Sequence, residues 1–223
     1  MGKFAKICFI FSVITLAACG GQQLRVKATG ECKNALMTGE TCSECQNGKI
    51  GRNCDIDTVV IGDKTWMAKN MDAYIGRDGK RIKCQLRTAN THTEQDISFM
   101  KEHGCLYTWQ DAIRACPNGF HLPTKEEFDA LIKQAGGSQE ASGEILRSRT
   151  WSGIDTFGFA ALPAGWRAEH GTHYDFGKGA FLWSATESAG NNQKAYFMHI
   201  DFGIPVTLDF SKKMAFSVRC VKD

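Results

Sequence analysis

The chain has little proline, little net charge and no long apolar run. Only 4 of its 223 residues are proline, against 23 glycines, which favours a loop-rich globular protein over a disordered one. Its formal net charge is +3, so it has no basic field for nucleic acid and no polybasic patch for anionic lipid. The apolar stretch at residues 7–18 is 12 residues long, whereas a membrane-spanning helix needs roughly 20. No other segment is apolar enough to span a membrane.

Several signatures of enzyme chemistry are also missing. The sequence contains no phosphate-binding loop, no Ser-His-Asp arrangement recognisable by motif and no clear pair of catalytic carboxylates. It has no internal repeat and no low-complexity tract. We therefore expect no cofactor.

The N-terminus is typical of an export signal. Lys3 and Lys6 precede the apolar stretch, and small residues follow it, which predicts a signal peptide over residues 1–18. Residues 16–19 read Leu-Ala-Ala-Cys, a pattern that resembles a bacterial lipobox. Cleavage before Cys19 and acylation of its sulfur would anchor the protein stably to a membrane. We expect an extracytoplasmic lipoprotein at the outer membrane or cell surface, with residues 19–31 as a flexible tether.

The mature chain would contain 223 − 18 = 205 residues and, without two signal lysines, a formal charge of 25 − 24 = +1. Outside the signal and the anchor, eight cysteines remain, an even number that indicates disulfides in an exported protein. They are Cys32, Cys42, Cys45, Cys54, Cys84, Cys105, Cys116 and Cys220.

The first four of these cysteines crowd into residues 32–55, which have almost no large apolar side chains. Such a segment needs covalent staples to fold. Two interpretations are open: a mini-module with two disulfides, or a zinc site with four thiolates. Only Cys42 and Cys45 are closely spaced, whereas zinc sites usually have two close pairs, so disulfides are favoured.

The main domain is expected over residues 57–223. Apolar residues 59–61, a Gly-Asp pair and residues 65–67 predict a β-hairpin. Two helices follow, one capped by Thr108 and ended by residues 117–119, the other starting with a capping box of Thr124 and Glu127. Residues 76–103 are polar and expected to be irregular. Residues 138–194 are glycine-rich and predict ordered loops with a few short strands, before strands return near the C-terminus.

An ordered set of motifs resembles one family of secreted bacterial domains. The motifs are VIGDKTWMAKNM at residues 60–71, LYTW at 106–109, ACPNGFHLPT at 115–124, FAALPAGWR at 159–167, LWSATE at 182–187 and FSVRCV at 216–221. Together they resemble the Fibrobacter succinogenes major paralogous domain family, which looks distantly related to the formylglycine-generating enzymes and to C-type lectins. The resemblance implies an α+β, C-type-lectin-like domain with two helices, short antiparallel strands and long ordered loops, whose N- and C-terminal strands pair. It implies no established activity.

The chemistry of the two distant relatives does not carry over. The formylglycine-generating enzymes hold copper with two neighbouring cysteines near the C-terminus, but Cys220 is the only cysteine after Cys116. C-type lectins bind calcium through a Glu-Pro-Asn or Gln-Pro-Asp loop and a Trp-Asn-Asp strand. The sequence has neither, and residues 183–185 read Trp-Ser-Ala. Copper-dependent oxidation and calcium-dependent sugar binding are therefore disfavoured.

Two disulfides are predicted in the main domain, and the resemblance supports the first of them. Cys116 lies on the apolar face of the first helix and Cys220 alternates with Phe216 and Val218, so both are expected to face the core. Lectin-like folds commonly join their first helix to their last strand, which predicts a Cys116–Cys220 pair. Cys84 and Cys105 flank a polar segment with little core of its own, and we expect a second disulfide between them to tether that segment.

Two functions are compatible with these features. We favour a non-catalytic binding or adhesion module for an extracellular glycan or protein, with Trp166, His170, His173, Tyr174, Asp175 and Trp183 as candidate ligand-binding residues. The histidines with Asp175 could instead be metal ligands, but a solvated loop is the simpler interpretation and no metal is expected. The tryptophans could equally fill the core. The alternative function is a hydrolase or modifying enzyme with its site in loops 138–194. A shallow aromatic strip would favour binding, and a buried charged cluster would favour the enzyme.

Overall fold

The structure is a computed structural model that describes residues 56–85, 94–139 and 141–223. These residues belong to one structural unit, residues 55–223. The signal segment, Cys19, the tether and the cysteine-rich segment 32–55 lie outside the described residues.

The first sheet joins the two ends of the described domain. β1 (Thr58–Ile61) and β2 (Lys64–Met67) form the predicted hairpin around Gly62, whose φ of 63° suits the tight turn. β11 (Val221–Lys222) pairs with β2 and with β4 (Phe120–His121), giving the order β1-β2-β11-β4. Trp66 of β2 lies opposite Val221, so the predicted pairing of N- and C-terminal strands is confirmed.

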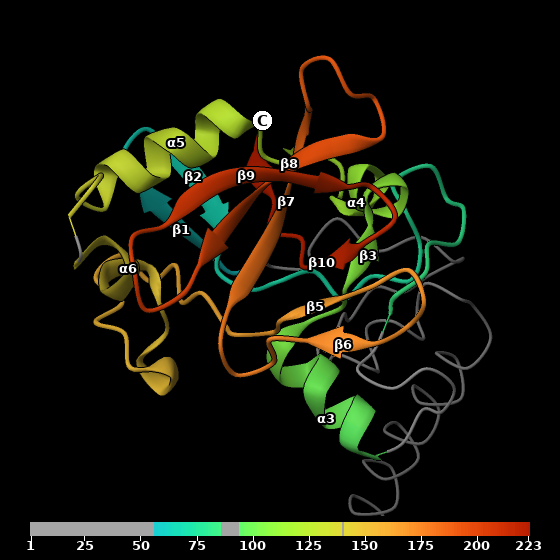
Figure 1. Ribbon diagram of the computed structural model, residues 1–223, viewed down its shortest axis with the longest axis horizontal. Coiled ribbons are helices and arrows are strands. Elements are labelled where there is room, and N and C mark those ends of the chain that lie inside the picture. Colours follow the sequence, from blue (N-terminus) through green and yellow to red (C-terminus); the bar gives the residue numbers. More distant parts are fainter. Residues whose placement is uncertain (1–55, 86–93, 140) are drawn as a thin grey trace, which may run out of the picture. The chain divides into compact units, whose positions relative to one another are not determined.

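Two further antiparallel sheets complete the described domain (Figure 1). One has four two-residue strands in the order β3-β10-β5-β6: β3 (Tyr107–Thr108), β10 (Ala215–Phe216), β5 (Trp166–Arg167) and β6 (His173–Tyr174). The other has three longer strands in the order β7-β8-β9: β7 (Ala180–Glu187), β8 (Lys194–Ile200) and β9 (Val206–Ser211).

The described residues contain four α-helices rather than the two that we expected. The predicted pair is α4 (Trp109–Ala115) and α5 (Lys125–Gln134), and α5 begins with the predicted capping box. Thr108 precedes α4, but its side chain makes no capping hydrogen bond to the backbone. The unexpected helices are α3 (Glu94–His103), in a segment expected to be irregular, and α6 (Ala141–Leu146), which precedes the 3-10 turn η1 (Arg149–Trp151). The domain is therefore α+β with more helix than the sequence pattern indicated.

The main core lies between α5 and the sheets. Trp66 packs against Phe128 of α5, with ring centroids 5.6 Å apart, and against Phe159 at 5.7 Å. Arg219 is fully buried beside them, where its guanidinium lies over the Phe159 ring and donates to Asn70 Oδ1 and to the Phe159 carbonyl. Burial lowers the pKa of Arg219 to about 9, so the residue remains a cation at neutral pH.

Both disulfides that we predicted for the main domain are present. Cys116 directly follows α4 and bonds to Cys220, which directly precedes β11. Cys84 bonds to Cys105 across 21 residues. Among the described residues, none of the helices is both long enough and apolar enough to cross a membrane.

Candidate functional site

The β5–β6 hairpin brings several of the predicted ligand-binding residues together. Trp166 lies opposite Tyr174 in the register of the hairpin, and Arg167 lies opposite His173. Because side chains alternate along a strand, Trp166 and Tyr174 share one side of the hairpin. Their rings stack with centroids 4.7 Å apart and planes inclined by 21°. The hairpin therefore presents an aromatic pair on one side.

Asp175 holds this pair in place. Its Oδ2 atom accepts a hydrogen bond of 2.8 Å from the indole nitrogen of Trp166. Its backbone has a φ of 54°, a left-handed conformation that aspartate tolerates better than most residues. Its carbonyl accepts hydrogen bonds from the backbone nitrogens of Lys178 and Gly179, which turn the chain back toward β7. The turn thus fixes the orientation of the indole.

The aromatic pair continues into an exposed apolar surface on the three-stranded sheet. In the registers of β7, β8 and β9, Phe181 lies opposite His199 and Phe197 lies opposite Leu208. The Trp166 ring packs against Phe181 at 6.4 Å and edge-on against Phe210 at 5.8 Å. We call this surface the aromatic face and define it by Trp166, Tyr174, Phe181, Val206, Leu208 and Phe210.

The aromatic face is open where it crosses β9. Alternate residues of this strand leave Leu208 48% exposed and Phe210 41% exposed, with Val206 beside them. The other side of β9 is held to α5, where Thr207 Oγ1 donates to Asp129. β9 is an edge strand of its sheet. An ion pair of 3.0 Å joins Glu169, in the loop between β5 and β6, to Lys213, which follows β9.

His199 adds a titratable group to this apolar surface. Its ring stacks on Phe181, with centroids 4.5 Å apart. Burial lowers the pKa of the imidazole, and the nearby carboxylates of Asp201 and Asp175 only partly offset that effect. His199 is therefore neutral at neutral pH, which suits its place among apolar side chains.

The remaining candidate residues are divided between the surface and the interior. His170 lies on the surface, 3.4 Å from the Tyr174 hydroxyl. His173 instead reaches the Ala164 carbonyl at 2.8 Å and packs against Phe99 and Phe176. The described part of the chain contains no group of three or more His, Cys, Asp or Glu residues placed to hold a metal ion. His170, His173 and Asp175 thus contact different partners and do not converge on one point.

Trp183 belongs to the core rather than to the surface. Its exposed fraction is 0%, and its indole nitrogen donates to the Tyr107 carbonyl at 2.8 Å. The Phe216 and Phe197 rings cover it. Trp151, another tryptophan of residues 138–194, is also buried, with 6% of its surface exposed. Of the predicted set, Trp166, His170, Tyr174 and Asp175 come together, whereas His173 and Trp183 do not join them.

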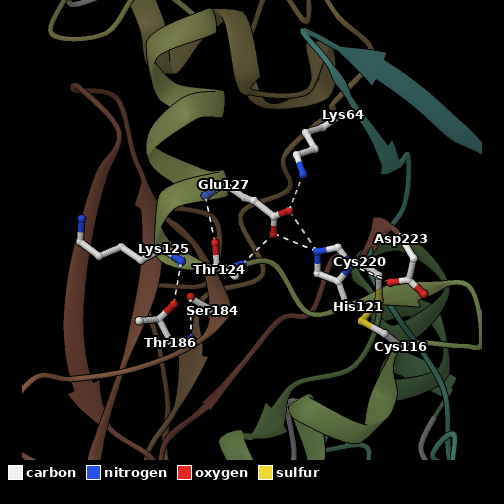
Figure 2. A network of polar contacts seen from close by, with 10 residues as sticks. All are labelled: Lys64, Cys116, His121, Thr124, Lys125, Glu127, Ser184, Thr186, Cys220 and Asp223. Carbon is white, nitrogen blue, oxygen red and sulfur yellow. Dashed lines mark hydrogen bonds and ion pairs between the residues drawn. A yellow bond between two sulfur atoms is a disulfide. The ribbon is translucent and has the colours of Figure 1, made fainter.

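A charged network lies at the start of α5, and sequence reasoning had identified only its capping box. Figure 2 shows the His121 imidazole between two carboxylates, with Asp223 Oδ1 at 2.8 Å from Nδ1 and Glu127 Oε2 at 3.0 Å from Nε2. Lys64 of β2 forms an ion pair of 2.9 Å with Glu127. The backbone nitrogen of Thr124 also donates to Glu127. The network therefore joins β2, β4, α5 and the residue after β11.

The ionisation of Glu127 fits a structural role. Burial alone would raise the pKa of this carboxyl, but hydrogen bonds from Thr124, Lys64 and His121 outweigh burial and lower it. A general acid at neutral pH needs a carboxyl pKa shifted in the opposite direction. The capping box and the disulfide Cys116–Cys220 lie beside this network in Figure 2. We interpret it as a clamp that holds α5 and the C-terminal strand together.

The domain has a counterpart among known protein families. Residues 59–222 match the family described as Fibrobacter succinogenes major domain, as the ordered motifs predicted. No curated protein and no solved structure matches the chain. The similarity to formylglycine-generating enzymes and C-type lectins remains a prediction.

Proposed function

The chain belongs to the Fibrobacter succinogenes major domain family, and from this premise we propose that it is a non-catalytic binding module of an extracytoplasmic lipoprotein. Its ligand, an extracellular glycan or protein, binds on the aromatic face. Acyl chains on Cys19 hold the protein to a bacterial membrane, at the outer membrane or cell surface. The domain shares a distant C-type-lectin-like ancestry, a view supported by the paired end strands and by the disulfide from α4 to the residue before β11.

The exposure of the aromatic face is the observation that carries this proposal. Leu208 and Phe210 stand on the open side of an edge strand, and Tyr174 continues the apolar surface on the hairpin. Contiguous exposed apolar surface on a soluble domain commonly marks an interaction site. The aromatic face is built from several elements, which gives it the extent that a large ligand requires.

The two ends of the face suit different ligands. Val206 and Leu208 are aliphatic and favour a protein partner, whose interface core is apolar. Tyr174 has His170 and Asp175 nearby, so that end combines a ring with polar groups that could hydrogen-bond a sugar. In loops 138–194, by contrast, Asp155 and Asp175 use their carboxylates to hold the loops themselves, accepting from the Ala160 backbone and the Trp166 indole. This use of acidic side chains supports binding over catalysis.

Two variants of the full-length protein test the proposal in a glycan-array screen and in a pull-down from cell-surface extracts. Leu208→Ser should abolish capture of a protein ligand, and Tyr174→Ala should abolish capture of a glycan. Val60→Ser is the matched control, because Val60 is an exposed apolar residue on β1, outside the aromatic face. If a ligand is captured equally well by all three variants, the aromatic face is not the binding surface.

A further inference from the structure

A second cluster, which shares no residue with the aromatic face, joins the end of α6 to the turn between β8 and β9. Arg147 directly follows α6, Trp151 ends η1, and Phe202 lies in the turn. The Arg147 guanidinium lies 4.8 Å from the centre of the Phe202 ring and 5.6 Å from that of Trp151. We call these three residues the Arg147 cluster. Figure 1 shows the turn beside α6.

The cluster places a cation beneath an apolar cover. Arg147 is 2% exposed, whereas Phe202 is 61% exposed. Ile154 and Ile204, also exposed, lie on the same two segments of chain. A ligand that approaches the guanidinium from the side of Phe202 therefore contacts an apolar ring.

Two buried N–H groups of the cluster have no acceptor. Arg147 Nη1 donates to the Asp201 carbonyl at 2.6 Å, and Nη2 donates to the Ser152 carbonyl at 3.4 Å. Within the described ranges, neither Arg147 Nε nor Trp151 Nε1 meets a hydrogen-bond partner. No carboxylate in the same ranges forms an ion pair with Arg147. Buried donors and buried charges are normally paired, because leaving them unpaired is costly.

The other buried arginines show that this fold can satisfy such groups. Arg219 uses Nε, Nη1 and Nη2 on Asn70 and the Phe159 carbonyl. Arg167 donates from Nε to the Gly171 carbonyl and from Nη1 to Gln85. Neither residue has a buried nitrogen that lacks an acceptor in the described chain. The lack of acceptors for Arg147 Nε and Trp151 Nε1 is therefore specific to this cluster and not general to buried arginines of the described domain.

We propose that Arg147 and Trp151 form a binding site for the carboxylate group of a small organic ligand. A carboxylate would neutralise the positive charge of Arg147. Its oxygens would also accept hydrogen bonds from Arg147 Nε and Trp151 Nε1, which have no acceptor within the described residues. The rest of the ligand packs against Phe202. This site shares no residue with the aromatic face, and the proposal does not rest on the proposed function.

The indole signal of Trp151 tests the site directly. The chain has five tryptophans, so a nitrogen–proton NMR spectrum of the full-length protein resolves at most five indole signals, and the Trp151→Phe variant identifies the one that is lost. Sodium glucuronate is the probe, titrated at constant ionic strength. We expect the Trp151 signal to shift saturably with glucuronate and to stay still with glucose or sodium chloride.

Variants link this response to the two donors. Arg147→Gln should weaken glucuronate binding at least tenfold, and Arg149→Gln, an exposed neighbour, should leave it unchanged within twofold. Should Arg147→Gln fail to fold, Trp151→Phe keeps an aromatic ring at this position and removes the pyrrole part of the indole together with its N–H donor. Its thermal stabilisation by glucuronate should fall to the level seen with sodium chloride. The proposal is overturned if the indole signal does not saturate, if Arg149→Gln and Arg147→Gln weaken binding equally, or if only a buried water contacts the indole at high glucuronate concentration.

Discussion

The indole nitrogen of Trp166 and the carboxylate of Asp175 are joined by a hydrogen bond of 2.8 Å across the end of the β5–β6 hairpin. This bond sets the orientation of the Trp166 ring, against which Tyr174, Phe181 and Phe210 pack. One turn residue therefore organises the centre of the aromatic face.

Comparing two substitutions of Asp175 should isolate this bond. Asp175→Asn keeps an acceptor oxygen and tolerates the left-handed backbone, whereas Asp175→Gly tolerates the backbone but has no acceptor. We expect the glycine variant to be about 1–2 kcal/mol less stable than the asparagine variant in urea unfolding. Its Trp166 indole signal should also move toward that of a solvated indole. Equal stability and equal indole signals in the two variants would show that the bond does not hold the ring.

The two disulfides should contribute unequally to stability. In the chain-entropy model the contribution grows with loop length, and the loops here span 104 and 21 residues. Replacing both Cys116 and Cys220 by alanine should cost about 4–5 kcal/mol, and replacing both Cys84 and Cys105 about 3 kcal/mol, as upper values. Equilibrium unfolding of the two double variants under identical conditions measures both. A larger loss from the Cys84 and Cys105 pair would contradict the order.

Local signals in the sequence were sufficient for part of the fold. The capping box of Thr124 and Glu127 predicts α5 because its hydrogen bonds span only three residues. The helix α6 escaped prediction because it has six residues and buries Ser142 and Gly143, so it shows no apolar period. The helix α3 was not predicted because most of its residues are polar. The adjacent buried residues Phe99 and Met100 do not form a helical apolar period.

The candidate site was predictable only where its residues are close in sequence. Trp166, Tyr174 and Asp175 belong to one hairpin, so their spacing placed them together. Leu208 and Phe210 were expected to form a strand, but alternation does not say which side of a strand faces solvent. Trp183 looks like any other tryptophan in the sequence, and its burial depends on Phe197 and Phe216, which are distant along the chain. The network around His121 likewise depends on tertiary contacts with Lys64 and Asp223.

Gly143 offers a test of the packing beneath the Arg147 cluster. Alanine is normally about 1 kcal/mol better than glycine inside a helix. A methyl group at Gly143, however, would overlap with the carbonyl oxygen of Gly203 in the β8–β9 turn. We expect Gly143→Ala to destabilise the protein by about 1–3 kcal/mol, measured by thermal or urea unfolding. Glu144→Ala, at an exposed position of the same helix, is the control and should change stability little. A stabilised Gly143→Ala variant would show that α6 does not contact the turn.

Membrane anchoring depends on one cysteine. If Cys19 is acylated, Cys19→Ser should lose labelling by a fatty-acid probe and should no longer sediment with membranes. Cys8→Ser is the matched control, because Cys8 lies within the predicted signal peptide and should leave both properties unchanged. Retention and labelling of the Cys19→Ser protein would refute the lipoprotein assignment.

Two histidines should make the domain less stable in mild acid. Burial lowers the pKa of both His103 and His199 below the value of about 6.5 expected in the unfolded chain. As pH falls below about 6.5, the unfolded chain therefore binds protons that the folded domain does not, and the free energy of unfolding decreases. The decrease ends once pH is below the folded pKa values, where both states are protonated.

This effect can be separated from that of the carboxylates. The pKa values of Asp78, Glu127 and Asp209 are lowered from ordinary values near 4, so their contributions are lost only at more acidic pH. Substituting His103→Phe and His199→Phe together removes both titrating groups and keeps a ring beside Phe99 and Phe181. We expect urea unfolding of this double variant to give a nearly constant stability between pH 7 and about pH 5, where the unchanged protein becomes progressively less stable. The two proteins differ only in the imidazoles of His103 and His199. If stability declines equally in both, other groups govern it in this pH range.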